Sequence, residues 1–207
     1  MVHTPPIFVL SGSFSVGKST LLQALSQQYG ETVRIIPEGS RISIENLAPD
    51  GIQHASPETR RAIQLAVIDY HKSAEHPTLS LEDPRPVISD TSLVEVMAYS
   101  KDFFTTEDFS DLETLVKSRA SSYVLLRIPC GIFDITQDGI RHEDMDFQRE
   151  IDDRIEETIR SMGCFQVAHM PKTCIELEDR LRFATEVLSE YGVVPRIPAY
   201  AATSCRI

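Results

Sequence analysis

Five short apolar runs divide the chain and predict five β-strands, because such runs, bounded by polar turns, are typical of buried strands. Longer segments between them carry apolar residues at helical spacing and predict helices, whereas residues 37–57 and 130–147 are polar and predict loops. The expected strands are 7–10, 33–36, 87–90, 123–128 and 165–168, and the expected helices are 19–25, 57–74, 92–100, 106–119, 148–162 and 173–191.

This alternation of strands and helices predicts an α/β fold with a mainly parallel sheet of five strands and helices on both faces. Sheets of this kind bind ligands at the carboxyl ends of their strands, so side chains just after each strand matter most. We expect one domain over residues 1–192. The remaining residues, 193–207, contain two prolines and no clear periodicity, and they predict an irregular tail.

The segment that follows the first predicted strand reads GSFSVGKS over residues 12–19. It matches G-x-x-x-x-G-K-[ST], the phosphate-binding P-loop, and a helical pattern follows it, so the fold expected is that of P-loop NTPases. Free N–H groups at the helix start favour an anion there, Lys18 can reach the β- and γ-phosphates, and the Ser19 hydroxyl can ligate Mg²⁺. The predicted contacts to ATP are Gly12, Ser13, Ser15, Val16, Gly17, Lys18, Ser19 and Thr20.

Two acidic residues stand at the ends of neighbouring predicted strands. Glu38 follows the second strand and Asp90 ends the third. Phosphoryl transfer to a hydroxyl needs a carboxylate near Mg²⁺ and a base for the proton. Asp90 is therefore a candidate for the metal or the acceptor, and Glu38 for the base or a second metal ligand. The alternative is that each acid only caps a following helix or turn.

Arginines form the other part of the predicted site. The segment 130–148 is expected to act as a mobile lid, since such loops bring arginines over a nucleotide in phosphoryl-transfer enzymes. Arg141 in this segment and Arg149 just beyond it are its candidate catalytic residues. Arg41, just past Glu38, is a candidate for binding the acceptor or a phosphate, and an ordinary surface arginine is the alternative.

The charge and composition exclude some classes of function. The 207 residues carry a net charge of −11, which argues against a broad basic surface for nucleic acid. No apolar stretch approaches the length of a membrane span, and the start of the chain does not resemble a signal peptide. The four cysteines lack zinc-ligand spacing, which favours reduced thiols and a cytoplasmic protein.

Taken in order, these motifs resemble those of a known group. The P-loop, Pro37-Glu38 with Arg41, Asp90-Thr91 and Asp138-Gly139-x-Arg141 are similar to the small AAA-type ATPase and kinase family that includes the ribosylnicotinamide kinase domain of NadR. A looser resemblance is to deoxynucleoside and thymidylate kinases. The resemblance implies that Glu38 lies near the reacting hydroxyl or the metal, that Asp90 binds acceptor or metal, and that Arg141 and Arg149 belong to a lid.

The function expected from these residues is that of a kinase. It would transfer the γ-phosphoryl group of ATP, with Mg²⁺, to a hydroxyl of a nucleoside-like or ribosyl acceptor, as a nicotinamide riboside kinase does. A nucleoside-monophosphate kinase and an ATP-dependent switch or binding module are the alternatives. A homodimer is possible. The aromatic residues Tyr70, Tyr99, Phe103 and Phe104 are candidates to stack on an acceptor ring or simply to fill the core.

Overall fold

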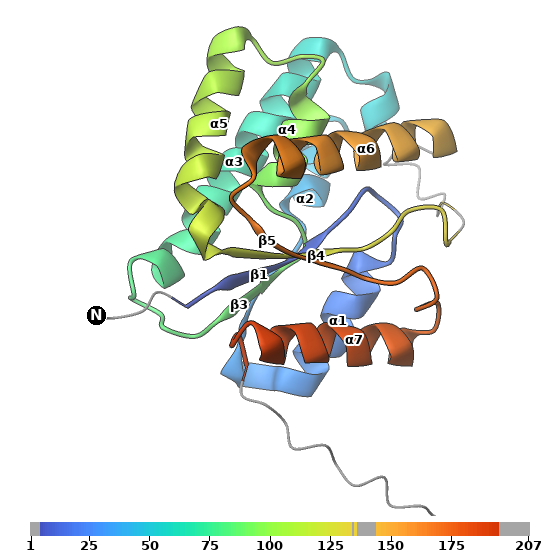
Figure 1. Ribbon diagram of the computed structural model, residues 1–207. Coiled ribbons are helices and arrows are strands. Elements are labelled where there is room, and N and C mark those ends of the chain that lie inside the picture. Colours follow the sequence, from blue (N-terminus) through green and yellow to red (C-terminus); the bar gives the residue numbers. More distant parts are fainter. Residues whose placement is uncertain (1–4, 134, 136–143, 195–207) are drawn as a thin grey trace, which may run out of the picture.

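The computed structural model describes residues 5–133, 135 and 144–194. Its centre is a parallel sheet of five strands in the order β2-β3-β1-β4-β5 (Figure 1). All five predicted strands are present, with ends that differ from the prediction by no more than a residue or so. Their bounds are β1 Ile7–Ser11, β2 Arg34–Ile36, β3 Val87–Ser89, β4 Tyr123–Arg127 and β5 Gln166–His169.

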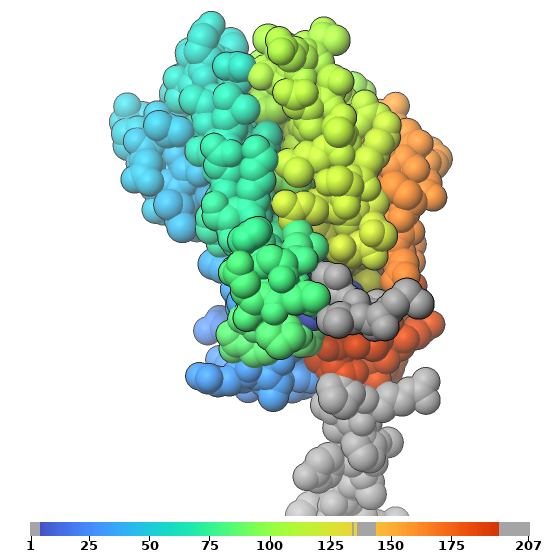
Figure 2. Space-filling view, turned by 90° about the vertical axis from the view of Figure 1, so that its left-hand side faces the viewer, coloured from blue at the N-terminus to red at the C-terminus, as the bar shows by residue number. Residues whose placement is uncertain are grey.

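Helices cover both faces of the sheet. Helices α1 and α7 lie on one face, and α2 to α6 form a thicker layer on the other (Figure 1). Figure 2 shows how segments far apart in the sequence pack side by side in that thicker layer. The helices are α1 Lys18–Tyr29, α2 Gly39–Leu47, α3 Pro57–Leu79, α4 Leu93–Ser100, α5 Thr106–Arg119, α6 Met145–Met162 and α7 Leu177–Glu190, and short 3₁₀ turns occur at Gly30–Thr32, Ile52–His54 and Ala120–Ser122.

The central strand β1 shows why the apolar runs are continuous. Successive side chains of a strand point to opposite faces. Ile7 and Val9 therefore pack with the α2–α6 layer, while Phe8 and Leu10 pack with α1 and α7, and all four are fully buried. Because both faces are covered, every position of β1 is apolar until Ser11, where the strand reaches the edge that carries the P-loop.

Some helix boundaries differ from the sequence prediction. Helix α2 lies inside the segment that was expected to be a polar loop. The sequence pattern did not predict this helix because only two of its residues, Gly39 and Ile44, are buried, so its apolar periodicity is weak. Helix α3 runs to Leu79, since Pro77 falls in its last turn, where little of the helix remains to be disturbed. Helix α6 begins at Met145, where the Asp144 side chain caps it, and α7 begins only at Leu177.

The predicted lid, residues 130–148, is described only in part. Residues 134 and 136–143 lie outside the described residues, and so does Arg141 with its Asp-Gly-x-Arg motif. The end of the segment is helical rather than a loop, because α6 takes in its final residues. The expected tail, 193–207, is described only at Val193 and Val194, which are buried against the α1–α7 layer.

A buried polar cluster lies at the amino end of the sheet, opposite the P-loop. The Tyr123 hydroxyl, at the start of β4, donates to both carboxylate oxygens of Glu75 at 2.8 and 3.0 Å. Arg119 donates to the same carboxylate at 3.0 Å, and His71 lies 3.3 Å from it. Burial, followed by the Glu75 charge, raises the pKa of Tyr123 well above its ordinary value, so the phenol stays protonated and keeps donating.

This cluster predicts a stability effect with no effect on ligand binding. The variant Tyr123→Phe removes a donor from a buried carboxylate and should lower the free energy of unfolding by roughly 1–2 kcal/mol, measured by urea titration. Tyr29→Phe is the matched control, because the buried Tyr29 hydroxyl has no hydrogen-bond partner in the described part of the chain. Equal stability of the two variants would contradict a stabilising role for the cluster.

Candidate nucleotide and acceptor site

The P-loop connects the end of β1 to the start of α1, as the sequence pattern predicts. Ser15 and Gly17 have positive φ values of 57° and 76°, which bend the chain sharply. The Lys18 ammonium is nearly buried and donates to the carbonyls of Gly12 at 2.9 Å and Ser13 at 2.6 Å. The loop therefore offers amide donors and one cation to an anion.

A second pair of residues has the chemistry of a Mg²⁺ site. The Ser19 hydroxyl, exposed at the start of α1, donates to Asp90 Oδ2 at 2.7 Å. Asp90 follows β3, the neighbour of β1, and is 1% exposed. Hydroxyl and carboxylate oxygens are ligands that suit Mg²⁺, which usually takes one or two protein ligands and completes its shell with water and phosphate oxygens. Among the described residues no cluster of three His, Cys, Asp or Glu forms a metal cage.

Glu38 stands at the end of β2, next to the start of α2. Its Oε1 accepts a hydrogen bond from Ser40 Oγ at 2.7 Å. The following residue, Gly39, leaves room for Tyr70 of α3: a Cβ at Gly39 would lie 2.3 Å from the Tyr70 ring. The Tyr70 hydroxyl donates to the Pro37 carbonyl at 3.0 Å. The close packing of α3 against this turn thus fixes the backbone position of Glu38.

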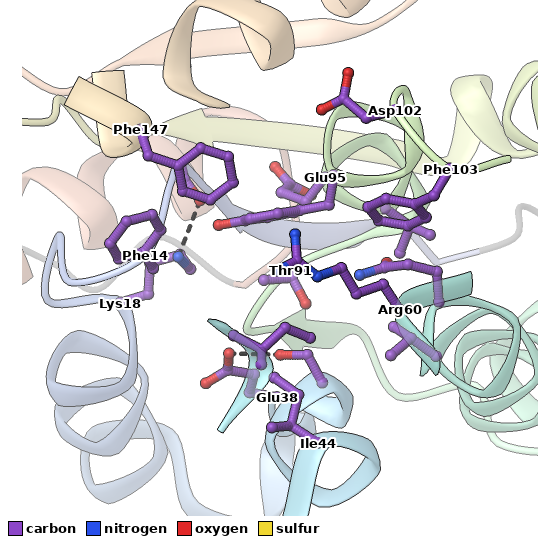
Figure 3. Close-up of a pocket in the computed structure, with 17 residues that line it drawn as sticks. Phe14, Lys18, Glu38, Ile44, Arg60, Thr91, Glu95, Asp102, Phe103 and Phe147 are labelled. Atoms are coloured by element: carbon purple, nitrogen blue, oxygen red, sulfur yellow. Dashed lines mark hydrogen bonds between the residues drawn. The ribbon is translucent and has the colours of Figure 1, made fainter. Parts of the chain in front are cut away.

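One pocket joins the P-loop to Glu38 (Figure 3). Its empty volume is about 990 Å³, including the part open to solvent. In Figure 3, Lys18 lies on one side, Arg60 and Phe103 on the other, and Glu38 with Ile44 below. The lining is largely apolar and includes aromatic rings from three segments of the chain: Phe14, Tyr99, Phe103 and Phe147.

Two pocket residues, Thr91 and Glu95, have unusual surroundings, and the sequence analysis assigned neither of them a role. Thr91 has a φ of 112°, a strained value for a β-branched residue, and such strain occurs often at ligand sites. Glu95 is 2% exposed and accepts hydrogen bonds from the backbone and hydroxyl of Ser92 and from the Ser11 hydroxyl. The Ser-x-x-Glu spacing of residues 92–95, a capping-box signature, could have drawn attention to Glu95. Other lining residues not foreseen are Arg60, Gln64 and Asp102.

The remaining predicted residues lie elsewhere. Of the four aromatic candidates, Tyr99 and Phe103 line the pocket, Tyr70 packs on Gly39, and Phe104 packs against the core. Arg41 is exposed and does not line the pocket. Arg149 is also exposed and pairs with Asp146 one turn earlier on α6, at 3.1 Å. The roles of Arg41 and Arg149 therefore stay predictions.

The order of the strands, the P-loop after β1 and the acids after β2 and β3 define a P-loop NTPase fold. The family model described as "AAA domain" matches residues 7–180, and the chain belongs to this family. No curated protein sequence matches the chain. Within the described residues, no helix has the length and apolar character needed to cross a membrane.

Solved structures show the same fold. The structure of "NadR protein in complex with NR" matches with a TM-score of 0.68 and 20% identity over 95% of this chain. The present chain spans only about half of that NadR, covering 54% of it. Thymidylate kinase from Candida albicans matches with a TM-score of 0.61 and 13% identity, over 93% of this chain and 95% of the kinase. Both likenesses agree with the resemblance stated from the motifs.

The position of Lys18 predicts that it supports nucleotide binding. Lys18→Ala removes the buried ammonium of the P-loop and should weaken the affinity for ATP with Mg²⁺ by roughly 100-fold or more, measured by calorimetry. Lys117→Ala is the control, because Lys117 is exposed on α5 and pairs only with Glu113 among the described residues. Unchanged affinity in Lys18→Ala would contradict the P-loop assignment.

The Ser19–Asp90 contact predicts a change in the metal requirement. Ser19→Ala and Asp90→Asn should each move the Mg²⁺ titration of ATP binding to higher metal concentration, because each removes an oxygen ligand or its charge. Asp69→Asn, on the exposed face of α3, should leave the titration unchanged. A Mg²⁺ titration identical to that of the unaltered chain in both site variants would contradict the assignment of these two oxygens to Mg²⁺.

Proposed function

We propose that this protein is a kinase that transfers the γ-phosphoryl group of ATP to a hydroxyl group of a nucleoside-like or ribosyl acceptor. The observation that carries the proposal is that Glu38 and Lys18 line one pocket: a carboxylate able to take a proton faces the cation of the phosphate-binding loop. Structures of the same fold with NR, and with NAD and AMP-PNP, support an acceptor and donor of this kind, as in a nicotinamide riboside kinase.

Each group of the site has a part in this reaction. The P-loop amides and Lys18 would hold the β- and γ-phosphates, and Ser19 with Asp90 would hold Mg²⁺, which neutralises charge on the phosphates. The aromatic side chains of the pocket would hold the acceptor ring. Glu38 would accept the proton of the attacking hydroxyl as the bond to phosphorus forms. The bond between the γ-phosphorus and the β–γ bridging oxygen of ATP would break as the acceptor oxygen bonds to phosphorus, and ADP would leave.

The charges in the pocket favour a hydroxyl acceptor over a nucleoside monophosphate. Apart from Lys18, the only cation among the described lining residues is Arg60, which donates to the carbonyls of Ala55 and Gln53. The described lining also includes the carboxylates of Glu38, Glu95 and Asp102, the last paired with Arg154. An acceptor phosphate needs cations beyond the one that holds the phosphates of ATP, and the described lining offers little positive charge for it, whereas a neutral acceptor has no such need.

Glu38→Gln tests the proposal directly. The change keeps the size of the side chain and removes its charge, so phosphoryl transfer should fall by roughly 10²-fold or more while ATP still binds. Transfer is measured as phosphorylated product from a panel of nucleosides, including nicotinamide riboside, and of nucleoside monophosphates. Glu45→Gln is the matched control, since Glu45 lies on the exposed side of α2 and outside the pocket.

The outcomes separate the alternatives. Recovery of the Glu38→Gln rate at high Mg²⁺ would make Glu38 a metal ligand, and no recovery would make it the base. Near-normal transfer by this variant would exclude both roles. Product from monophosphates alone would establish a nucleoside-monophosphate kinase. Failure of the unaltered protein to phosphorylate any compound, with ATP still bound, would favour an ATP-dependent binding module.

A further inference from the structure

The carbonyl groups of the P-loop need partners of their own. A loop that turns its N–H groups toward an anion turns its carbonyls the other way, and a buried carbonyl must be hydrogen-bonded. Lys18, inside the loop, satisfies Gly12 and Ser13. The carbonyls of Phe14 and Val16 accept hydrogen bonds from side chains that lie outside the loop. Gln148 Nε2 donates to the Phe14 carbonyl at 2.6 Å, and Arg180 Nη2 donates to the Val16 carbonyl at 2.8 Å.

These two donors are buried and come from opposite sides of the sheet. Gln148 is 1% exposed and Arg180 is 3% exposed, although both residue types are usually at the surface. Gln148 lies in α6, above the sheet in Figure 1, and Arg180 lies in α7, below it. The loop between Phe14 and Val16 is therefore held from both faces. Its middle residue, Ser15, is the one with the left-handed φ of 57°.

Arg180 is fitted closely to the loop. A Cβ at Gly17 would lie 2.4 Å from Arg180 Nη1, so only glycine allows the guanidinium to reach this place. On its other side the guanidinium carbon lies 5.0 Å from the centre of the Phe133 ring, a cation–π contact. Burial lowers the pKa of Arg180.

We propose that Gln148 and Arg180 are positioning residues of the nucleotide site, which hold the Phe14 and Val16 carbonyls outward and so keep the loop amides arranged for the phosphates of a nucleoside triphosphate. The proposal rests on the nucleotide binding in the proposed function, but it does not depend on the acceptor. Without these donors the buried carbonyls would turn to find other partners, and the strained turn at Ser15 would relax.

The test compares ATP affinity with stability. Arg180→Met and Gln148→Met remove the donors and keep the bulk of the side chains. Each should weaken ATP binding, measured by calorimetry with excess Mg²⁺ well below the melting temperature, by about tenfold or more. Arg182→Met, two residues further along α7 and exposed, controls for the change in helix composition. Leu188→Ala controls for stability, because Leu188 is buried in α7 away from the P-loop hydrogen bonds.

We expect Leu188→Ala to lower the melting temperature while its ATP affinity stays within about twofold of that of the unaltered chain. The proposal is overturned if Arg180→Met and Gln148→Met bind ATP normally, or if Leu188→Ala weakens binding as much as they do. If either Arg180→Met or Gln148→Met does not fold, the ATP affinity of the other variant alone tests the proposal. A lack of ATP binding by the unaltered chain would instead overturn the proposed function, so the two failures are distinguishable.

Discussion

A loop of backbone can hold a phosphate only while its amide groups point inward, and this requirement organises the site. The P-loop meets it through two left-handed residues, Ser15 and Gly17, and through donors that occupy its carbonyls. The central position of β1 puts the loop between β3 and β4, at the edge of the sheet where ligands of α/β proteins bind. The rest of the fold brings other groups to this loop.

The acceptor side is assembled from the neighbouring strands. β3 lies beside β1 and carries Asp90 to the Ser19 hydroxyl, and β2 lies beside β3 and carries Glu38 into the pocket. Glu95 ties these parts together, because it accepts hydrogen bonds from Ser11, at the end of β1, and from Ser92, at the start of α4. The small number of cations among the described pocket residues is the main physical reason to favour a hydroxyl acceptor.

The Glu75 cluster and the candidate ligand site lie at opposite ends of the sheet. The Glu75 cluster, with Tyr123 and Arg119, satisfies buried polar groups at the amino ends of the strands. At the carboxyl ends, Thr91 and Ser15 have positive φ, and buried donors hold the P-loop. Strain is tolerated there because the packed helices on both faces over-determine the backbone, and the strained residues line the site that we assign to ligands.

The sequence by itself determined the five strands, the parallel α/β fold, the P-loop and the two acids that follow strands, because each depends on local spacing or on the rule that parallel strands end at one edge. The tertiary structure alone decided which side chains complete the site. Gln148 and Arg180 reach the loop from 134 and 164 residues away, and neither stands in a recognisable motif. A local sequence pattern predicts the helix or strand in which a residue lies. Contacts such as these depend instead on how α6 and α7 pack on the two faces of the sheet.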